Sequence, residues 1–296
     1  MSKNKIAIYW GCFTPTKQYA LELSTRSVFE TLSIEIIELK NSACCGYPYR
    51  GVKPKLWTYL AARVMALAED QGFDRILPVC NGCYNSLIKT KFYLEKDKKL
   101  LEEINDLLRE ENLEYKGGVK PIHVIEYFHD YFGIKSLKEK FFSRDRSNIR
   151  IAAHYGCDAI RPGEVPHFDN SRNPQKFENI IEALGFSTVR DYPRKLDCCG
   201  APLMAINPEL GLRVSGLKLK NVKQTGVDLL VTTCEYCFEM LDTRQESVSK
   251  IFNEELNVPV MYYQQLLGLV LGIPEKELGL NFNMSPIHVF LEKLKR

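Results

Sequence analysis

Cys44-Cys45-Gly46 and, 35 positions after Cys45, Cys80-Asn81-Gly82-Cys83 mark a stretch that the chain contains twice. The second copy runs from Cys198-Cys199-Gly200 to Cys234-Glu235-Tyr236-Cys237 with the same spacing and no gap. In both copies proline follows the second cysteine of the pair by 3 and by 9 positions, glycine by 27 and aspartate by 29. This set of matches predicts an internal duplication, and its long period indicates two copies of one domain rather than a solenoid.

A further cysteine precedes each copy, at the end of a short apolar run. Cys12 follows Ile6-Ala7-Ile8-Tyr9-Trp10-Gly11, and Cys157 follows Ile151-Ala152-Ala153-His154-Tyr155-Gly156. Each copy therefore has five cysteines, and the two copies use all 10 in the chain. The first cysteine set is Cys12, Cys44, Cys45, Cys80 and Cys83, and the second cysteine set is Cys157, Cys198, Cys199, Cys234 and Cys237.

Length and duplication together predict two domains. A chain of 296 residues exceeds the usual size of one domain. The duplication places the division between residues 1–147 and residues 148–296. A hydrophobic content of 45% is sufficient for two packed cores. The first copy also has an insertion of 16 residues after its last cysteine, around a charged amphipathic helix that we predict at 95–112.

The charge balance excludes some classes of function. The net charge is only +3, with 40 basic and 37 acidic residues, which argues against nucleic acid as the main ligand. No signal peptide is visible at the N-terminus, and the apolar stretch 261–273 is too short to span a membrane. We expect a cytoplasmic protein without a transmembrane segment. Any association with a membrane would then depend on partner subunits.

The order of elements predicts an α/β fold. In the first copy, a strand at 6–9, a helix at 19–32, a strand at 34–39, a helix from Pro54 and a strand at 75–79 follow one another. The second copy repeats this plan, with strands at 149–155, 186–192 and 229–232. We therefore expect two pseudo-twofold-related repeats, each a small parallel sheet with crossover helices. All five cysteines of a copy can then meet at the rim beyond the carboxyl ends of its strands.

Two segments lie outside the repeated plan. Residues 135–149 are basic and polar, and we interpret them as a linker between the repeats. The second copy has a longer loop at 158–173, which we expect to face a substrate or a partner.

Five cysteines in one place favour a metal cluster. In a reducing cytosol, cysteines at motif spacing are more often metal ligands or redox groups than disulfides, and an odd number per domain cannot all pair within it. A tetrahedral zinc site and a cubane iron-sulfur cluster each take four ligands, which leaves one cysteine over in each copy. Five thiolates fit a larger iron-sulfur cluster better. One cubane cluster, or zinc in one half, remains the alternative.

These motifs carry a resemblance to a known family. The pattern Cys, Cys-Cys-Gly and Cys-x-x-Cys, present twice, is similar to the cysteine-rich CCG domain, and the layout of the whole chain resembles the B subunit of heterodisulfide reductase. Tyr155-Gly156-Cys157 followed by Arg161-Pro162 is similar to a signature of that subunit's second half. The resemblance implies that each cysteine set is the ligand set of a noncubane four-iron four-sulfur cluster. Asp158 stands where family members often have histidine, and Gly46 where methanogen versions commonly have proline.

The resemblance also implies an activity. We expect the iron-sulfur catalytic subunit of a heterodisulfide reductase-like complex, which reduces or forms a small disulfide by one-electron steps at two clusters. The alternative is an electron-transfer subunit of a sulfur-oxidising or succinate/fumarate-quinone reductase-type complex, with no disulfide substrate of its own. The glycine spacing of nucleotide or flavin sites is missing from the sequence. We therefore expect ferredoxin-like iron-sulfur and flavin-containing partner subunits to deliver the electrons.

Two further residues near the second cysteine set are candidates for a supporting role, since the clusters rather than a side-chain nucleophile would carry the chemistry. His154 occupies the position of Tyr9 in the first copy. It is either a donor to a cluster sulfur or to a leaving thiolate, or a hydrogen-bonded core histidine. Arg161 either meets an anionic substrate or forms a surface ion pair, and we favour the ion pair.

Overall fold

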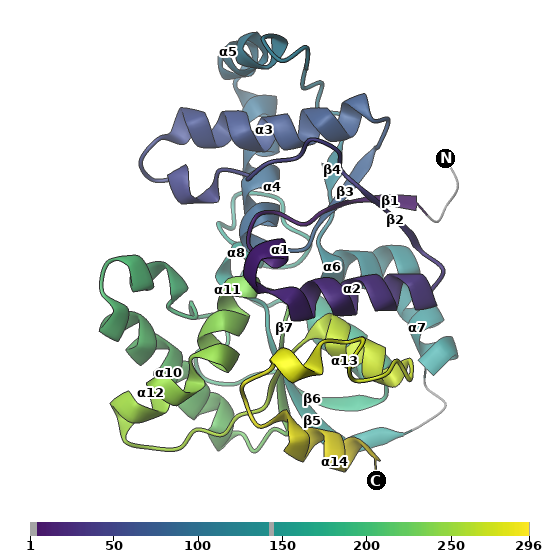
Figure 1. The fold of residues 1–296 in the computed structure, drawn as a ribbon, viewed down its shortest axis with the longest axis vertical. Helices are drawn as coiled ribbons and strands as arrows, with labels where there is room; N and C mark the ends of the chain where they lie inside the picture. Colours follow the sequence, from purple (N-terminus) through teal and green to yellow (C-terminus); the bar gives the residue numbers. More distant parts are fainter. Residues whose placement is uncertain (1–4, 142–144, 296) are drawn as a thin grey trace. The chain divides into compact units, whose positions relative to one another are not determined.

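Two four-stranded parallel sheets with helices confirm the predicted α/β class (Figure 1). The computed structural model describes residues 5–141 and 145–295. The first sheet has the order β2-β1-β3-β4 and the second the order β6-β5-β7-β8, with every pair parallel. The matching orders are those expected of a duplicated domain. The strands are β1 (Lys5–Tyr9), β2 (Glu35–Glu38), β3 (Arg75–Pro78), β4 (Lys120–Pro121), β5 (Arg146–His154), β6 (Phe186–Val189), β7 (Leu229–Thr232) and β8 (Val260–Tyr262).

The central strands are covered on both faces. β1 and β7 are buried along nearly their whole length, as parallel strands between crossover helices must be. The fourth strand of each sheet, β4 or β8, was not predicted. Two or three residues are too few for a periodic pattern, and these strands are defined by their pairing with β3 and β7.

One helix of the first repeat differs from the prediction in its bounds. The helix expected at 95–112 is α5, which begins after Asp97 and ends at Arg109, whereas residues 95–96 belong to the preceding helix α4, which begins directly after Cys80. Asp97 separates them because its carboxylate accepts a hydrogen bond from the backbone N–H of Leu100, 3.0 Å away, and so caps α5. The first-repeat helices are α1 (Thr14–Lys17), α2 (Tyr19–Thr31), α3 (Pro54–Asp70), α4 (Asn81–Lys96), α5 (Lys98–Arg109) and α6 (Val124–Glu126).

The segment interpreted as a linker is largely structured. Residues 134–141 form α7 (Ile134–Phe141), and β5 begins at Arg146. The buried side chain of Leu137 anchors this helix. Ile134, Leu137 and Phe141 stand at helical spacing, so the pattern was present among the lysines that favoured a linker. The remaining helices are α8 (Cys157–Ile160), α9 (Lys176–Ala183), α10 (Pro208–Gln224), α11 (Glu235–Phe238), α12 (Gln245–Phe252), α13 (Tyr263–Val270) and α14 (Ile287–Lys295).

The chain forms two compact units, each of which includes residues from the other repeat. Unit 1 contains the residues up to Gln18, then Phe29–Val124 and Asp158–Ser171. Unit 2 contains Tyr19–Val28, Ile125–Cys157 and the residues from Arg172 onward. The predicted boundary at 147/148 separates the two sequence repeats, and as a boundary between folding domains it stays a prediction. None of the helices in the described ranges is long and apolar enough to cross a membrane.

A tight left-handed turn follows the cysteine pair in each unit. Gly46 has φ 77° and Gly200 has φ 92°, a conformation that costs other residues free energy. The turn at Gly200 is also crowded, because a Cβ there would lie 2.3 Å from the carbonyl oxygen of Gly211 on α10. Glycine in the Cys-Cys-Gly motif is therefore required by the backbone geometry.

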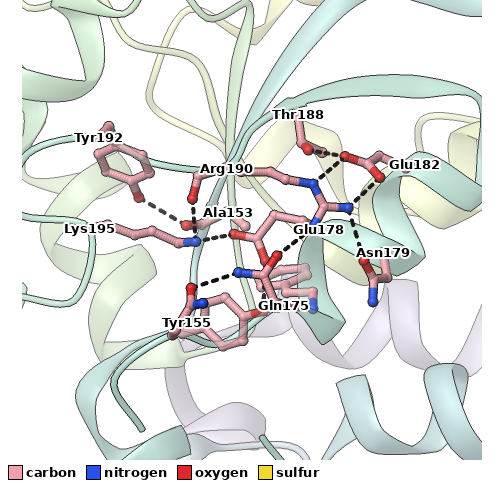
Figure 2. Close-up of polar contacts among 12 residues, drawn as sticks. Ala153, Tyr155, Gln175, Glu178, Asn179, Glu182, Thr188, Arg190, Tyr192 and Lys195 are labelled. Carbon is pink, nitrogen blue, oxygen red and sulfur yellow. Dashed lines mark hydrogen bonds and ion pairs between the residues drawn. The ribbon is translucent and has the colours of Figure 1, made fainter. Parts of the chain in front are cut away.

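A buried ion pair organises the polar interior of unit 2 (Figure 2). The Nζ of Lys195 lies 2.6 Å from a carboxylate oxygen of Glu178 on α9, and both side chains are almost completely buried. The hydroxyl of Tyr155 donates a hydrogen bond to the same carboxylate at 2.7 Å, and Lys195 also donates to the backbone carbonyl of Arg190. The pair thus joins α9 and the end of β5 to the segment that leads to Cys198.

We predict that Lys195→Met lowers the free energy of unfolding by about 3–5 kcal/mol, because it leaves the Glu178 carboxylate buried without a cation. Urea denaturation of the metal-free protein measures this loss. The matched control is Lys5→Met, since the pair between Lys5 and Glu35 is exposed and should cost below about 1 kcal/mol. Equal losses in the two variants would contradict the assigned importance of the buried pair.

We also predict that Gly200→Ala destabilises the protein more than Gly46→Ala. Both substitutions force alanine into the left-handed region, at about 1–2 kcal/mol. Only Gly200 adds a clash at 2.3 Å, whereas the nearest atoms at Gly46 lie 3.1 Å from the added Cβ. Urea unfolding gives the order, and Gly51→Ala is the control because nothing lies within 4 Å of its Cβ position. A Gly200→Ala variant as stable as Gly51→Ala would disprove the crowded turn.

Candidate iron-sulfur site

The five cysteines of the first set come together in unit 1. Cys12 follows β1, the pair Cys44 and Cys45 follows β2, and Cys80 caps the N-terminus of α4 directly after β3. Parallel strands bring these ends to one edge of the sheet, as the sequence predicted.

Contacts between the thiols link the whole first set. Cys44 forms hydrogen bonds with Cys12 and Cys45, and the Sγ atoms of Cys45 and Cys83 are 3.4 Å apart. Cys83 in turn contacts Cys80. At the end of β1, a Cβ on Gly11 would lie 2.9 Å from the Sγ of Cys83, so this turn packs directly against the set.

The second set repeats this arrangement in unit 2. Cys198 forms hydrogen bonds with Cys157 and Cys199, and Cys237 forms them with Cys199 and Cys234. The order of contacts between equivalent thiols is therefore the same in both units. Among the described residues, no three His, Cys, Asp or Glu side chains surround a position for a single metal ion, and each set is instead a chain of neighbouring thiols.

Each set combines one readily ionised thiol with neighbouring thiols that keep their protons more firmly. Hydrogen bonds from Cys12 and Cys45 lower the pKa of Cys44 to about 2, and hydrogen bonds from Cys157 and Cys199 lower that of Cys198 to about 2. The hydrogen bond to Cys44 raises the pKa of Cys45 to about 11, because its thiol donates to the ionised neighbour. Thiolates are the form that binds soft metals, so a cation or a metal cluster would stabilise both sets.

Each set is open to solvent on one side only. Cys12 is exposed, and Cys44, Cys157 and Cys198 are partly exposed. The second cysteine of each pair and both cysteines of each Cys-x-x-Cys motif are buried. A small molecule can therefore approach each unit from the side of the upstream cysteine and the first cysteine of the pair.

His154 lies beside the second set and is completely buried. Neither ring nitrogen has a well-formed hydrogen-bond partner among the described residues, and burial together with the charge of Lys218 lowers the pKa of His154 well below its usual range. The backbone of Lys195 and the thiolate of Cys198 act in the opposite direction and are outweighed. The imidazole is thus neutral, and its polar contact is a weak hydrogen bond with the backbone of Lys195 that falls short of good geometry. Both interpretations of His154 from the sequence stay predictions.

Arg161 does not belong to either cysteine set. Its side chain is exposed and forms no ion pair with any described residue. The surface ion pair that we favoured for Arg161 is therefore not found within residues 5–141 and 145–295. The backbone carbonyl of Arg161 instead accepts a hydrogen bond from the Asn85 amide at 2.6 Å, within unit 1. The same amide donates to the carbonyl of Asp158, while Tyr47 and Arg50 bind the Asp158 carboxylate. The segment after Cys157 is therefore held by residues that flank the first set.

The sequence analysis missed Lys218 on α10, which is completely buried near the second set. One signal could have identified it. Lys218 stands 19 positions after Cys199, where the first copy has Val64 after Cys45. A lysine at a position that is apolar in the other repeat of a duplicated helix is unusual, because lysine is seldom buried without a reason.

Comparison with known proteins supports the internal duplication. The model of the cysteine-rich (CCG) domain family matches residues 6–88 and again 151–242. A solved structure of a hypothetical protein from Helicobacter pylori has a TM-score of 0.75, with 17% sequence identity, over 95% of this chain and 52% of that chain. That likeness shows the fold alone.

Relatives of known name match nearly the full length. The chain is 32% identical over 98% of its length, and 97% of the relative, to the B subunit of the ferredoxin/F420H2-dependent CoB-CoM heterodisulfide reductase of Methanosarcina acetivorans. It is 31% identical to a protein of Archaeoglobus profundus that is named as similar to the heterodisulfide reductase B subunit, over 93% of this chain and 94% of the relative. It is 30% identical to the 8-methylmenaquinol:fumarate reductase membrane anchor subunit of Wolinella succinogenes, over 95% of this chain and 97% of that protein. The repeated cysteine pattern, the two matched domains and these full-length identities together show that the chain belongs to the family of heterodisulfide reductase B subunits, with its cysteine-rich CCG domain in two copies.

Proposed function

We propose that this chain is the iron-sulfur catalytic subunit of a heterodisulfide reductase-like complex. In this proposal the first and second cysteine sets each hold a noncubane four-iron four-sulfur cluster with all five thiolates as ligands. The observation that carries it is the linked contact of five thiols in each unit, in the same sequence in both copies. A zinc site or a cubane cluster would use only four of the five.

The residues around the thiols fit such a group. Cys44 and Cys198 are readily ionised, and thiolates are the ligand form. The ring nitrogens of His154 are buried and lack a well-formed hydrogen bond among the described residues, and buried polar groups normally have partners. Sulfur atoms of a bound cluster would be acceptors for the N–H of this histidine. The fit therefore extends beyond the thiols.

The proposed reaction is the reduction of a disulfide, or its reverse. Reduction breaks one S–S bond, takes up two electrons and two protons, and releases two thiols. An iron-sulfur cluster, when bound, exchanges single electrons and offers iron to stabilise negative charge on sulfur. The chain itself binds the clusters and leaves Cys12, Cys44, Cys157 and Cys198 accessible on the side where a small disulfide would approach. His154 would donate its N–H to a sulfur at the second set. We propose ferredoxin-like iron-sulfur and flavin-containing subunits as the electron source.

The second candidate is an electron-transfer subunit without its own disulfide substrate. It is favoured by the 30% identity to a protein named as a fumarate reductase membrane anchor subunit. The partial exposure of each cysteine set favours the catalytic subunit, because a relay between protein partners does not require access for a small molecule.

We predict that the double substitution Cys80→Ser and Cys83→Ser removes about half of the bound iron and acid-labile sulfide from anaerobically purified protein, because it removes two ligands from one of two equal sites. Cys234→Ser with Cys237→Ser should do the same. Val52→Ser, a change at an exposed position outside both sets, should leave the iron content unaltered. Iron-free, zinc-containing protein would contradict the proposal.

Turnover separates the two candidate functions. With a reduced viologen as electron donor, the iron-loaded protein should reduce small disulfides, and Cys44→Ser or Cys198→Ser should lower kcat by at least about 100-fold. Val52→Ser is again the control. Unimpaired turnover in either cysteine variant would rule out the catalytic proposal. Iron-loaded protein that takes up electrons and leaves every tested disulfide intact would favour the electron-transfer subunit.

A further inference from the structure

The side chain of Lys218 is a buried cation that holds the loop of the second cysteine pair. It is completely buried on α10, and its Nζ donates hydrogen bonds to the backbone carbonyls of Arg194 and Lys195, the latter at 3.2 Å. One helical turn earlier, the hydroxyl of Ser215 donates to the carbonyl of Cys199 at 2.5 Å. The same face of α10 therefore contacts the backbone on both sides of Cys198.

Lys218 has no carboxylate partner, although acidic residues lie near it. Its polar contacts are the two backbone carbonyls, and none of the ion pairs of the described residues includes it. The neighbouring cation Lys195 is paired with Glu178, and Asp197 is bound by Arg194 at 3.0 Å. A buried charge without a counter-charge is costly, so an ammonium in this place needs an anion that side-chain carboxylates do not supply.

The groups whose negative charge would raise the pKa of Lys218 are mostly thiols of the second set. Cys237 acts most strongly, followed by Asp197, Cys199 and Cys198. Cys198 is readily ionised, whereas the pKa values of Cys199 and Cys237 are raised, so these two become anions only as ligands of a bound metal group. Burial lowers the pKa of Lys218 to about 8, which leaves the ammonium largely protonated at neutral pH. A positive charge is thus fixed beside the second set, in an interior of low dielectric where its field is strong.

In the first unit, the loop that leads to the cysteine pair is held without a buried charge. The positions of Ser215 and Lys218 correspond to Ala61 and Val64 on α3, both of which are buried and apolar. The loop before Cys44 is held instead by the hydroxyl of Tyr9, which donates to the carbonyl of Ala43 at 2.5 Å. Because a neutral group is sufficient to anchor this loop, anchoring alone does not explain a buried cation in the second unit.

We propose that Lys218 raises the reduction potential of the group held by the second cysteine set. This inference rests on the proposed function. Each electron taken up makes the bound group more negative, and a fixed cation stabilises the reduced form more than the oxidised form. Lys218 acts through the cluster and not on the substrate, so it is a positioning residue. Glu235, a buried acidic residue, stands at the position of Asn81 in the first copy. A negative charge there would act in the opposite direction, so the inference concerns the effect of Lys218 at the second site and not the order of the two potentials.

The test is a potentiometric titration monitored by electron paramagnetic resonance. It uses the full chain with Cys44→Ser and Cys45→Ser, so that the signal belongs to the second site. Lys218→Gln is the main variant, because its amide can still donate to the carbonyls of Arg194 and Lys195 while the charge is lost. At a fixed potential, the ratio of reduced to oxidised second-site cluster should fall about tenfold, which is a shift of about 59 mV for one electron. Lys218→Arg, which keeps the charge, should restore the original ratio.

Two controls separate a charge effect from a structural one. Ser215→Ala removes the other α10 contact with the loop without changing charge, and it should leave the potential unaltered. In the reciprocal background, with Cys198→Ser and Cys199→Ser, Lys218→Gln should leave the potential of the first site unaltered. A Lys218→Gln protein with intact iron and an unchanged second-site potential would overturn this inference alone. Absence of iron from the unmodified protein would overturn the proposed function and this inference with it.

Discussion

The gathering of five thiols at one edge of each sheet is the constraint on which the rest of the structure depends. Thiolates repel one another, so such a set forms only where the backbone fixes the positions of the sulfur atoms and a cation or metal compensates their charge. The parallel sheet supplies the positions, because β1, β2 and β3 all end at the rim where Cys12, Cys44 and Cys80 follow. The close turn at Gly46 and the helix that begins after Cys80 then bring Cys45 and Cys83 to within 3.4 Å of each other. The uncompensated charge that remains is the reason to expect a bound cluster.

Much of this could be predicted from sequence, because the duplication made each element visible twice. The apolar runs predicted the longer strands, and Pro54 and Pro208 predicted where two helices begin. The convergence of each cysteine set follows from the rule that the carboxyl ends of parallel strands lie at one edge of the sheet. β4 and β8 could not be predicted, since strands of two and three residues have no periodicity and exist only through pairing with their neighbours. α7 was missed for a different reason. Ile134, Leu137 and Phe141 recur at helical spacing, but the many lysines between them led to the interpretation of this segment as a linker.

The site could be predicted only to the level of its ligands. The environment of the second set depends on side chains from several elements, and the sequence gives no measure of how deeply each is buried. His154 was identified because it occupies the position of Tyr9 in the other copy, but the lack of a well-formed hydrogen bond at its ring nitrogens is a property of the packed interior. Arg161 has an exposed side chain without an ion pair, and its contribution to the packing of unit 1 comes from its carbonyl group, which no side-chain pattern indicates. Lys218 could have been found by comparing the repeats position by position.

The differences between the copies have a common physical character. In the first unit, the positions that correspond to His154 and Lys218 hold Tyr9 and Val64, whose side chains carry no charge. In the second unit, the corresponding positions hold His154 and Lys218, and the Lys195–Glu178 pair lies one step further from the thiols. Polar and charged groups in a core are costly, and a duplicated gene begins with two identical cores, so substitutions that introduce them in only one copy need a compensating gain. If each copy only held a cluster in place, the apolar solution of the first unit would serve both. The two cysteine sets thus share the arrangement of their thiols and differ beside them, where the second copy has an imidazole and an ammonium in place of a phenol and an isopropyl group.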